Sequence, residues 1–207
     1  MEIVRPILFL DIDGVLNSHQ HMGEKFEDIK NSVENWHELS DEEKYEVHAK
    51  SQIYKDLVDH VNAVYAATKC LFVLSSSWRN HFPLWKVQGM LGQKGFEGTL
   101  IGCTGRVFSG HRGREIGNWL EELFPTTKRH DLRYAIVDDD ADMGIHEDRL
   151  VRTDTRIGIT AEDVKKLIQM LGREFLQCPE CKGAGSLDIE RGGSWIECHI
   201  CDGSGCV

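Results

Sequence analysis

Two carboxylates, Asp11 and Asp13, follow directly on the apolar run Ile7–Leu10, and a glycine comes after them. Residues two apart in an extended segment point to the same side. Each carboxylate then raises the free-energy cost of ionising the other. A hard divalent cation that prefers oxygen ligands, Mg²⁺ above all, would offset that cost.

The same residue types could carry out phosphoryl transfer. A carboxylate beside Mg²⁺ can attack a phosphoryl group, because the metal screens the repulsion between the two anions. A second carboxylate can protonate the leaving oxygen and later take a proton from the attacking water. The hydroxyl of Ser75 and a cation from the region between the second and third apolar runs would hold the remaining phosphate oxygens.

The apolar pattern predicts the elements that position these side chains. Short apolar runs predict buried strands at Ile7–Leu10, Leu71–Leu74 and Tyr134–Val137, with a further short strand at Leu150–Thr153. Stripes at helical spacing lie between and after these runs, and the last stripe follows Thr160 and Asp163 in capping-box spacing. The stripes are Ile53, Leu57, Val61 and Val64; Ile116, Trp119, Leu120 and Leu123; and Val164, Leu167, Ile168 and Leu171. This alternation predicts a three-layer α/β domain with a mainly parallel sheet.

In such folds the ligand lies outside the carboxyl ends of the strands. The residues that follow the predicted strands are all polar, at 11–13, 75–77 and 138–140. Asp138 and Asp139 are therefore expected to meet Asp11 and Asp13 at one edge of the sheet. An Asp-x-Asp-Gly string alone also occurs in calcium-binding loops and ordinary turns, and acids after a strand can cap a helix.

Composition and charge exclude some classes of function. The 207 residues are 41% hydrophobic and 28% charged, which is typical of a water-soluble globular protein. A net charge of −10 argues against a large basic surface for duplex nucleic acid but allows a local basic patch. No apolar stretch has the length of a membrane span and residues 1–5 lack a secretory pattern, so we expect a cytoplasmic protein without a membrane partner.

Four ordered strings resemble the motifs of the haloacid dehalogenase (HAD) superfamily of phosphohydrolases. They are DIDGVLN, LFVLSSSWR, HRGREIGNWL and YAIVDDDADM, and the likeness covers residues 1–175. It implies a HAD-like Rossmannoid sheet in which Asp11 is the nucleophile and Asp13 the general acid/base. The resemblance also implies that Ser75 binds phosphate, and that Asp138 and Asp139 complete a Mg²⁺ site to which Asp13 lends its main-chain carbonyl.

The third motif requires a cation near the start of a helix, and the chain offers Arg112 and Arg114. We favour Arg112, because Arg114 is expected on the exposed side of the helix that carries Ile116 and Trp119. Asp140 and Asp142 are expected to face solvent or to lie just behind the metal ligands.

Longer strings narrow the likeness to one subgroup. SSSWR, RGREIGNWL and VDDDADM, with LVRTD and GIT, resemble HAD domains found in or beside nucleic-acid repair proteins, related to polynucleotide 3′-phosphatases. The implied substrate is a nucleotide or a terminal phosphate on a nucleic acid. Ser76, Trp78 and Arg79 are then candidate substrate contacts, with Arg114 as a further one; a packed tryptophan and a surface arginine are the alternative at 78 and 79.

Residues 18–51 interrupt the alternation of strands and helices. They are rich in His, Glu, Asp and Lys. Two interpretations are open: a partly helical, cap-like insertion over the strand ends, or an irregular surface excursion.

The cysteines predict a second module at 176–207. Cys178 and Cys181 are separated by sixteen residues from Cys198 and Cys201, and four thiolates at this spacing can bind one structural Zn²⁺. The repeated CxxCxGxG resembles the zinc-binding region of DnaJ-type proteins. Cys206 has no partner in this pattern, whereas Cys70 and Cys103 are expected to be buried thiols in apolar surroundings.

The segment between the cysteine pairs predicts a hairpin. Gly192 and Gly193 lie beside Trp195 and Ile196, which would be presented to a protein partner, a second subunit or the HAD domain. The balance of charges in this module is −3, which disfavours contact with a phosphate backbone.

Three functions are consistent with these patterns. The first is a Mg²⁺-dependent phosphatase for nucleotides or nucleic-acid ends. The second is a phosphatase for small metabolites or free nucleotides, with the insertion closing over the substrate. The third is a zinc-bearing binding protein whose HAD domain has lost activity. An open site favours polymeric ends, and an insertion folded across it favours small molecules.

Overall fold

The structure, a computed structural model, describes residues 5–21, 30–107, 111–123 and 132–172, together with the backbone of two strands at 186–190 and 194–197. The chain divides into two compact units, Met1–Gly172 and Arg173–Val207. Within the described residues, no helix combines the length and the apolar composition that a membrane crossing requires.

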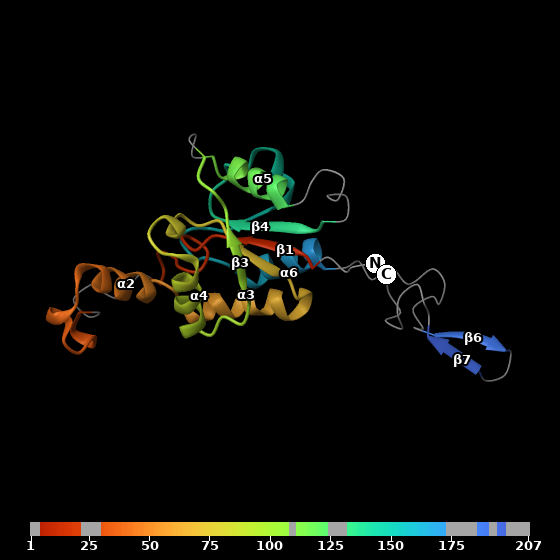
Figure 1. The fold of residues 1–207 in the computed structure, drawn as a ribbon, viewed down its shortest axis with the longest axis horizontal. Coiled ribbons are helices and arrows are strands. Elements are labelled where there is room, and N and C mark those ends of the chain that lie inside the picture. Colours follow the sequence, from red (N-terminus) through yellow and green to blue (C-terminus); the bar gives the residue numbers. More distant parts are fainter. Residues whose placement is uncertain are drawn as a thin grey trace. The chain divides into compact units, whose positions relative to one another are not determined.

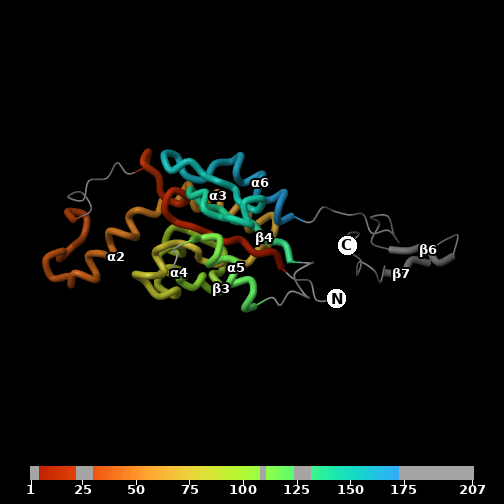
Figure 2. The backbone as a smooth tube through the Cα atoms, turned by 90° about the horizontal axis from the view of Figure 1, so that it is seen from above, coloured from red at the N-terminus to blue at the C-terminus, as the bar shows by residue number. Residues whose placement is uncertain are grey.

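The first unit is built on a five-stranded parallel sheet in the order β3-β2-β1-β4-β5 (Figure 1). The strands are β1 (Ile7–Leu10), β2 (Leu71–Leu74), β3 (Leu100–Cys103), β4 (Tyr134–Asp138) and β5 (Leu150–Arg152). The first strand runs through the middle of the sheet beside β4 (Figure 2), and Ile7 lies in register with both Leu71 and Tyr134. The predicted α/β class with a parallel sheet is confirmed.

Helices cover both faces of the sheet, as the alternation of side chains along β1 requires. Leu8 and Leu10 face the core formed with α3 (Lys55–Thr68), α4 (Leu84–Gln93) and α6 (Ala161–Leu171). Ile7 and Phe9 face a smaller core with α5 (Arg112–Leu123) and with Met143, which precedes the 3₁₀ helix η4 (Gly144–Arg149). Figure 1 shows α5 on one side of the strands and α3 and α4 on the other.

Two helices occur where the sequence predicted them. The capping box that opens α6 is formed, with the Thr160 hydroxyl accepting from the Asp163 N–H and the Asp163 carboxylate accepting from the Thr160 N–H. The stripe of α3 buries Leu57, Val61 and Val64.

One strand and one α-helix that contact the main sheet core were not predicted. The strand β3 lies at the edge of the sheet, so Ile101 and Cys103 are exposed and the strand lacks a continuous apolar run. The expectation of a buried Cys103 is therefore wrong, whereas Cys70 is buried. Helix α4 contains two glycines, which weaken the helical signal of its sequence.

The described part of the insertion is helical. It contains the 3₁₀ helix η1 (Trp36–Glu38) and α2 (Asp41–Ser51), which starts at a Ser40–Glu43 capping box; a further 3₁₀ helix, η2 (Ser77–Asn80), follows β2. Tyr45 stacks on Phe82, which lies between η2 and α4, with ring centroids 5.3 Å apart. Lys86 of α4 pairs with Glu46 at 2.7 Å. The insertion thus packs on the segment between η2 and α4 and on α4 itself; residues 22–29 lie outside the described residues.

In the second unit the backbone forms β6 (Ser186–Glu190) and β7 (Ser194–Glu197), which pair antiparallel. Ser186 lies opposite Glu197, and Leu187 lies opposite Ile196. The predicted strand pairing is confirmed. The five cysteines of this module, namely Cys178, Cys181, Cys198, Cys201 and Cys206, lie outside the described residues.

Candidate active site

Three carboxylates meet at the carboxyl edge of the sheet. Asp11 follows β1, Asp138 ends β4, and Asp139 comes next in the chain. One oxygen of each lies within 4.8 Å of the others; Asp11 and Asp138 are buried and Asp139 is half-buried. Adjacent parallel strands end at the same edge, so the pairing of β1 with β4 brings these acids together.

Arg112, at the start of α5, reaches into this cluster. Its Nη2 donates to Asp11 Oδ2 at 3.2 Å, and its Nε lies 3.0 Å from Asp138 Oδ2. The other Asp11 oxygen accepts from the backbone N–H of Ile12 at 2.7 Å. Arg114 is exposed and lines a separate cavity between α5 and η4. Of the two candidate arginines, the fold brings Arg112 to the acids.

The backbone around Gly113 explains how Arg112 is aimed. The N–H of Gly113 donates to the carbonyl of Asp142 at 2.9 Å. A Cβ atom at Gly113 would lie only 2.1 Å from the carbonyl oxygen of Met143. The helix therefore approaches the segment after β4 as closely as a residue without a side chain allows, which places the neighbouring Arg112 over the cluster.

Asp13 occupies a different environment from Asp11. It is exposed, and its carboxylate accepts from the indole N–H of Trp78 at 3.1 Å and from the amide of Asn17 at 2.9 Å. The Ser77 hydroxyl lies at 3.4 Å. Trp78 is itself buried, so it acts as a packed residue that holds Asp13 in place. The carboxylate of Asp13 is not part of the group of three acids.

Hydroxyl groups line the exits of the neighbouring strands. Ser75 and Thr104 are buried, and their side-chain oxygens have no hydrogen-bond partner within the described residues. The Ser76 hydroxyl accepts from the Trp78 N–H at 3.4 Å, and its hydrogen bond to Asp11 favours the ionised carboxylate. Buried polar groups are usually hydrogen-bonded, so the hydroxyl groups of Ser75 and Thr104 are candidate donors to a bound ligand.

A buried ion pair fixes Arg79. Its guanidinium pairs with the Glu115 carboxylate of α5 and donates to the carbonyl of Ser75 at 2.6 Å. Only 7% of each of the two side chains, Arg79 and Glu115, is exposed. The interpretation of Arg79 as a surface residue is therefore wrong, because Glu115 compensates its buried charge. Glu115 could have been suspected from the sequence, since it lies one helical turn before Trp119 on the apolar stripe of α5.

Asp139 is held by residues at the end of β5 and just after it. Its carboxylate accepts from the Thr155 hydroxyl at 2.9 Å, and its carbonyl accepts from Arg152 Nε at 2.9 Å. Gly14 packs against it with a positive φ of 68°, and a Cβ there would lie 2.3 Å from an Asp139 oxygen. No pattern in the sequence distinguishes Thr155 from an ordinary turn residue.

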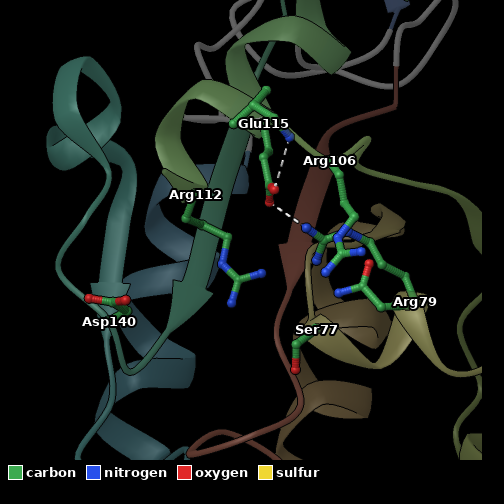
Figure 3. Close-up of a pocket in the computed structure, with 8 residues that line it drawn as sticks. Ser77, Arg79, Arg106, Arg112, Glu115 and Asp140 are labelled. Atoms are coloured by element: carbon green, nitrogen blue, oxygen red, sulfur yellow. Dashed lines mark hydrogen bonds and ion pairs between the residues drawn. The ribbon is translucent and has the colours of Figure 1, made fainter. Parts of the chain in front are cut away.

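A cavity of about 740 Å³ lies beside the acids and shares Arg112 with them. Its lining includes the arginines Arg79, Arg106 and Arg112 and the acids Glu115 and Asp140 (Figure 3). Asp140 and Asp142 are exposed, as expected. No described residue of the insertion lines this cavity.

Burial makes ionisation of the cluster costly. Burial is the largest cause that raises the pKa values of both Asp11 and Asp138; the Asp11 charge further raises the pKa of Asp138, and the Asp13 charge raises that of Asp11. The Arg112 guanidinium opposes both shifts, and the acids in turn raise the pKa of Arg112. The single positive charge of Arg112 does not neutralise three carboxylates, so the site retains negative charge that a further cation could balance. Hard carboxylate oxygens at this spacing suit Mg²⁺.

A five-stranded parallel sheet with buried acids at its carboxyl edge is the arrangement that the resemblance to the HAD superfamily implied. Residues 7–164 match the family model described as the HAD domain in Swiss Army Knife RNA repair proteins, and the chain belongs to this family. No curated protein and no solved structure matched the chain.

Proposed function

We propose that this protein is a Mg²⁺-dependent phosphomonoesterase that removes a terminal phosphate from a nucleic acid through an aspartyl-phosphate on Asp11. The observation that carries the proposal is the convergence of Asp11, Asp138 and Asp139 within 4.8 Å, with Arg112 bound to two of them. The residues proposed as nucleophile, metal ligands and phosphate-binding cation thus lie together at one edge of the sheet.

The three carboxylates fit Mg²⁺ in ligand type, spacing and charge. Asp13 would contribute its main-chain carbonyl, as the resemblance to the superfamily implies. When bound, the metal would offset the charge of the acids and polarise the phosphoryl group.

In the first step an Asp11 oxygen attacks the phosphorus atom, and the bond from phosphorus to the leaving oxygen breaks. Asp13, held by Trp78 and Asn17, gives its proton to that oxygen. In the second step water attacks the phosphorus atom and Asp13 takes a proton from the water. The Asp11 carboxylate is thereby regenerated and inorganic phosphate leaves.

Two groups are assigned to hold the phosphate. Arg112 lies beside the nucleophile and would donate to phosphate oxygens as well as to Asp11. The unpartnered hydroxyl of Ser75, at the end of the neighbouring strand, is the second donor. Both would stabilise the charge that develops on the transferred group.

The substrate class rests on the family and on the openness of the site. The family is named for RNA repair proteins, and the longer strings resemble polynucleotide 3′-phosphatases. The described part of the insertion contacts Phe82, just after η2, and Lys86 of α4, and does not line the cavity. These observations support the end of a polymer over an enclosed small molecule.

Phosphate release from 3′- and 5′-phosphorylated oligonucleotides, mononucleotides and sugar phosphates, with and without Mg²⁺, tests this function. We expect Mg²⁺-dependent release, fastest on a 3′-phosphorylated oligonucleotide. Asp11→Asn should lower turnover by at least ~10³-fold, because it removes the nucleophile. Asp148→Asn, a matched change of an exposed acid in η4, should leave it unchanged. Turnover retained in Asp11→Asn would disprove the assignment of the nucleophile.

We also propose that Cys178, Cys181, Cys198 and Cys201 hold one structural Zn²⁺. The antiparallel pairing of β6 with β7 supports this, because the chain enters and leaves the pair at the same end. The two CxxC motifs flank that end in the sequence. The apolar residues of the hairpin make a protein partner or a second copy of the chain the proposed role of this module.

A further inference from the structure

The cavity beside the acids is larger than the transferred group requires. At about 740 Å³ it falls in the range that accommodates a ligand of many atoms, whereas a phosphoryl group fills a small part of it. Arg112 forms one part of its wall and contacts Asp11, so the cavity adjoins the reacting centre. The remainder of the cavity must receive the part of the substrate next to the scissile phosphate.

Three guanidiniums line this cavity, but they differ in how far their charge is already compensated. Arg79 is paired with Glu115, and Arg112 is paired with Asp11 and Asp138. Arg106 is exposed, and no hydrogen bond or ion pair joins it to another residue in the described part of the chain.

The remaining acid of the cavity wall does not compensate Arg106. Asp140 accepts from the backbone N–H groups of Ala141 and Asp142. In Figure 3 the side chain of Arg112 lies between Asp140 and the guanidinium of Arg106, which points into the cavity from the segment after β3. Arg106 is therefore available to an anion.

We infer that Arg106 binds a second phosphate of the substrate, the phosphodiester next to the terminal phosphate that is removed. The guanidinium suits this role, because its planar fork matches two phosphate oxygens. A protein with a net charge of −10 repels a polyanion at long range, so a local cation is needed to hold a strand. This inference rests on the proposed function and specifies its substrate: a chain end rather than an isolated monoester.

The test compares substrates that differ only in their phosphates. They are a 3′-phosphorylated dinucleotide, a nucleoside 3′-monophosphate and a nucleoside 3′,5′-bisphosphate. We expect Arg106→Ala to lower kcat/KM on the dinucleotide about ten- to a hundredfold, mainly through KM, and to leave the monophosphate unchanged. Arg106→Lys should recover part of the loss. A loss on the bisphosphate as well would show that a free phosphate also reaches Arg106, and a loss on the dinucleotide alone identifies the phosphodiester.

An equal change on dinucleotide and monophosphate, or no change on either, overturns the inference. Lys165→Ala, which removes an exposed charge on α6, is the matched control and should change neither substrate.

Binding separates this inference from the proposed function. If the wild type releases no phosphate from any substrate, the proposed function fails. The dissociation constants of the same compounds then decide the inference, with the wild type and Arg106→Ala compared by calorimetry. Weakening by about tenfold or more on the dinucleotide, with a salt slope reduced by about one, supports the contact. Equal affinities of the two proteins refute it.

Discussion

At the scale of single residues, Asp138 is held where its ionisation is costly. Burial and the Asp11 charge raise its pKa above the value in the unfolded chain. The metal-free native state therefore binds a proton more tightly than the unfolded state, and the free energy of unfolding must fall as pH rises through the interval between the two pKa values.

We therefore expect the Tm of the metal-free protein to fall by about 3 °C or more between about pH 5 and pH 8. Mg²⁺ should raise the Tm more at the higher pH, because it binds the ionised carboxylates. Thermal unfolding in chelator, with and without added Mg²⁺, measures both effects. Asp138→Asn should flatten the pH dependence; a Tm that rises with pH in the metal-free wild type would contradict this account.

The Arg79–Glu115 pair makes a second prediction for single residues. Glu115→Gln keeps the shape of the side chain but leaves the buried Arg79 guanidinium without a counter-charge. We expect the free energy of unfolding to fall by about 3 kcal/mol or more, measured by urea denaturation. Glu162→Gln breaks an exposed pair with Lys165 and should cost less than about 0.5 kcal/mol. Similar small losses in both variants would show that the buried pair contributes little.

At the scale of elements, the closeness of α5 to the segment after β4 determines where Arg112 lies. Gly113→Ala would place a Cβ atom 2.1 Å from the Met143 carbonyl, and a backbone atom cannot yield easily. We expect a loss of about 1–3 kcal/mol in the free energy of unfolding and about 10²-fold in kcat/KM, since Arg112 moves with the helix.

Gly89→Ala is the matched control for Gly113→Ala. Gly89 also lies inside a helix, but nothing lies within 4 Å of the added Cβ. This variant should be more stable by about 0.5–1 kcal/mol and equally active. Urea denaturation and phosphate release on both variants test the comparison, and an active, stable Gly113→Ala would show that the contact is not needed.

The elements also show what sequence reasoning can reach. Strands buried on both faces, such as β1, β2 and β4, appear as continuous apolar runs, so they and the polar residues at their ends were predictable. The orientation of the Asp13 side chain was harder to predict. The chain enters a turn at Asp13, so the alternation of side chains in an extended strand no longer applies there. Arg106 was not predicted because it follows an edge strand whose apolar signal is weak. Its proposed role also depends on the ion pairs of Arg79 and Arg112, which the sequence does not reveal.

At the scale of the whole molecule, the two units make a prediction about zinc. Purified protein should contain one zinc per chain, and Cys178→Ser should lose it, whereas Cys206→Ser should retain it. Metal analysis measures both. Release of phosphate from an aryl phosphate should persist in Cys178→Ser, because the described site lies entirely within Met1–Gly172. Protein purified without chelator that contains no zinc would refute the proposal.

The central place of β1 has a consequence during synthesis. Its two neighbouring strands lie at very different distances along the chain. Ile7 of β1 pairs with Leu71 of β2 on one side, and with the much later Tyr134 of β4 on the other. While the ribosome is still adding the residues of α5, one side of β1 has unsatisfied backbone groups and Asp11 has no second strand beside it. The nascent chain therefore depends on the late arrival of β4 both to close its sheet and to assemble its acids, and it is most exposed to aggregation just before that strand emerges.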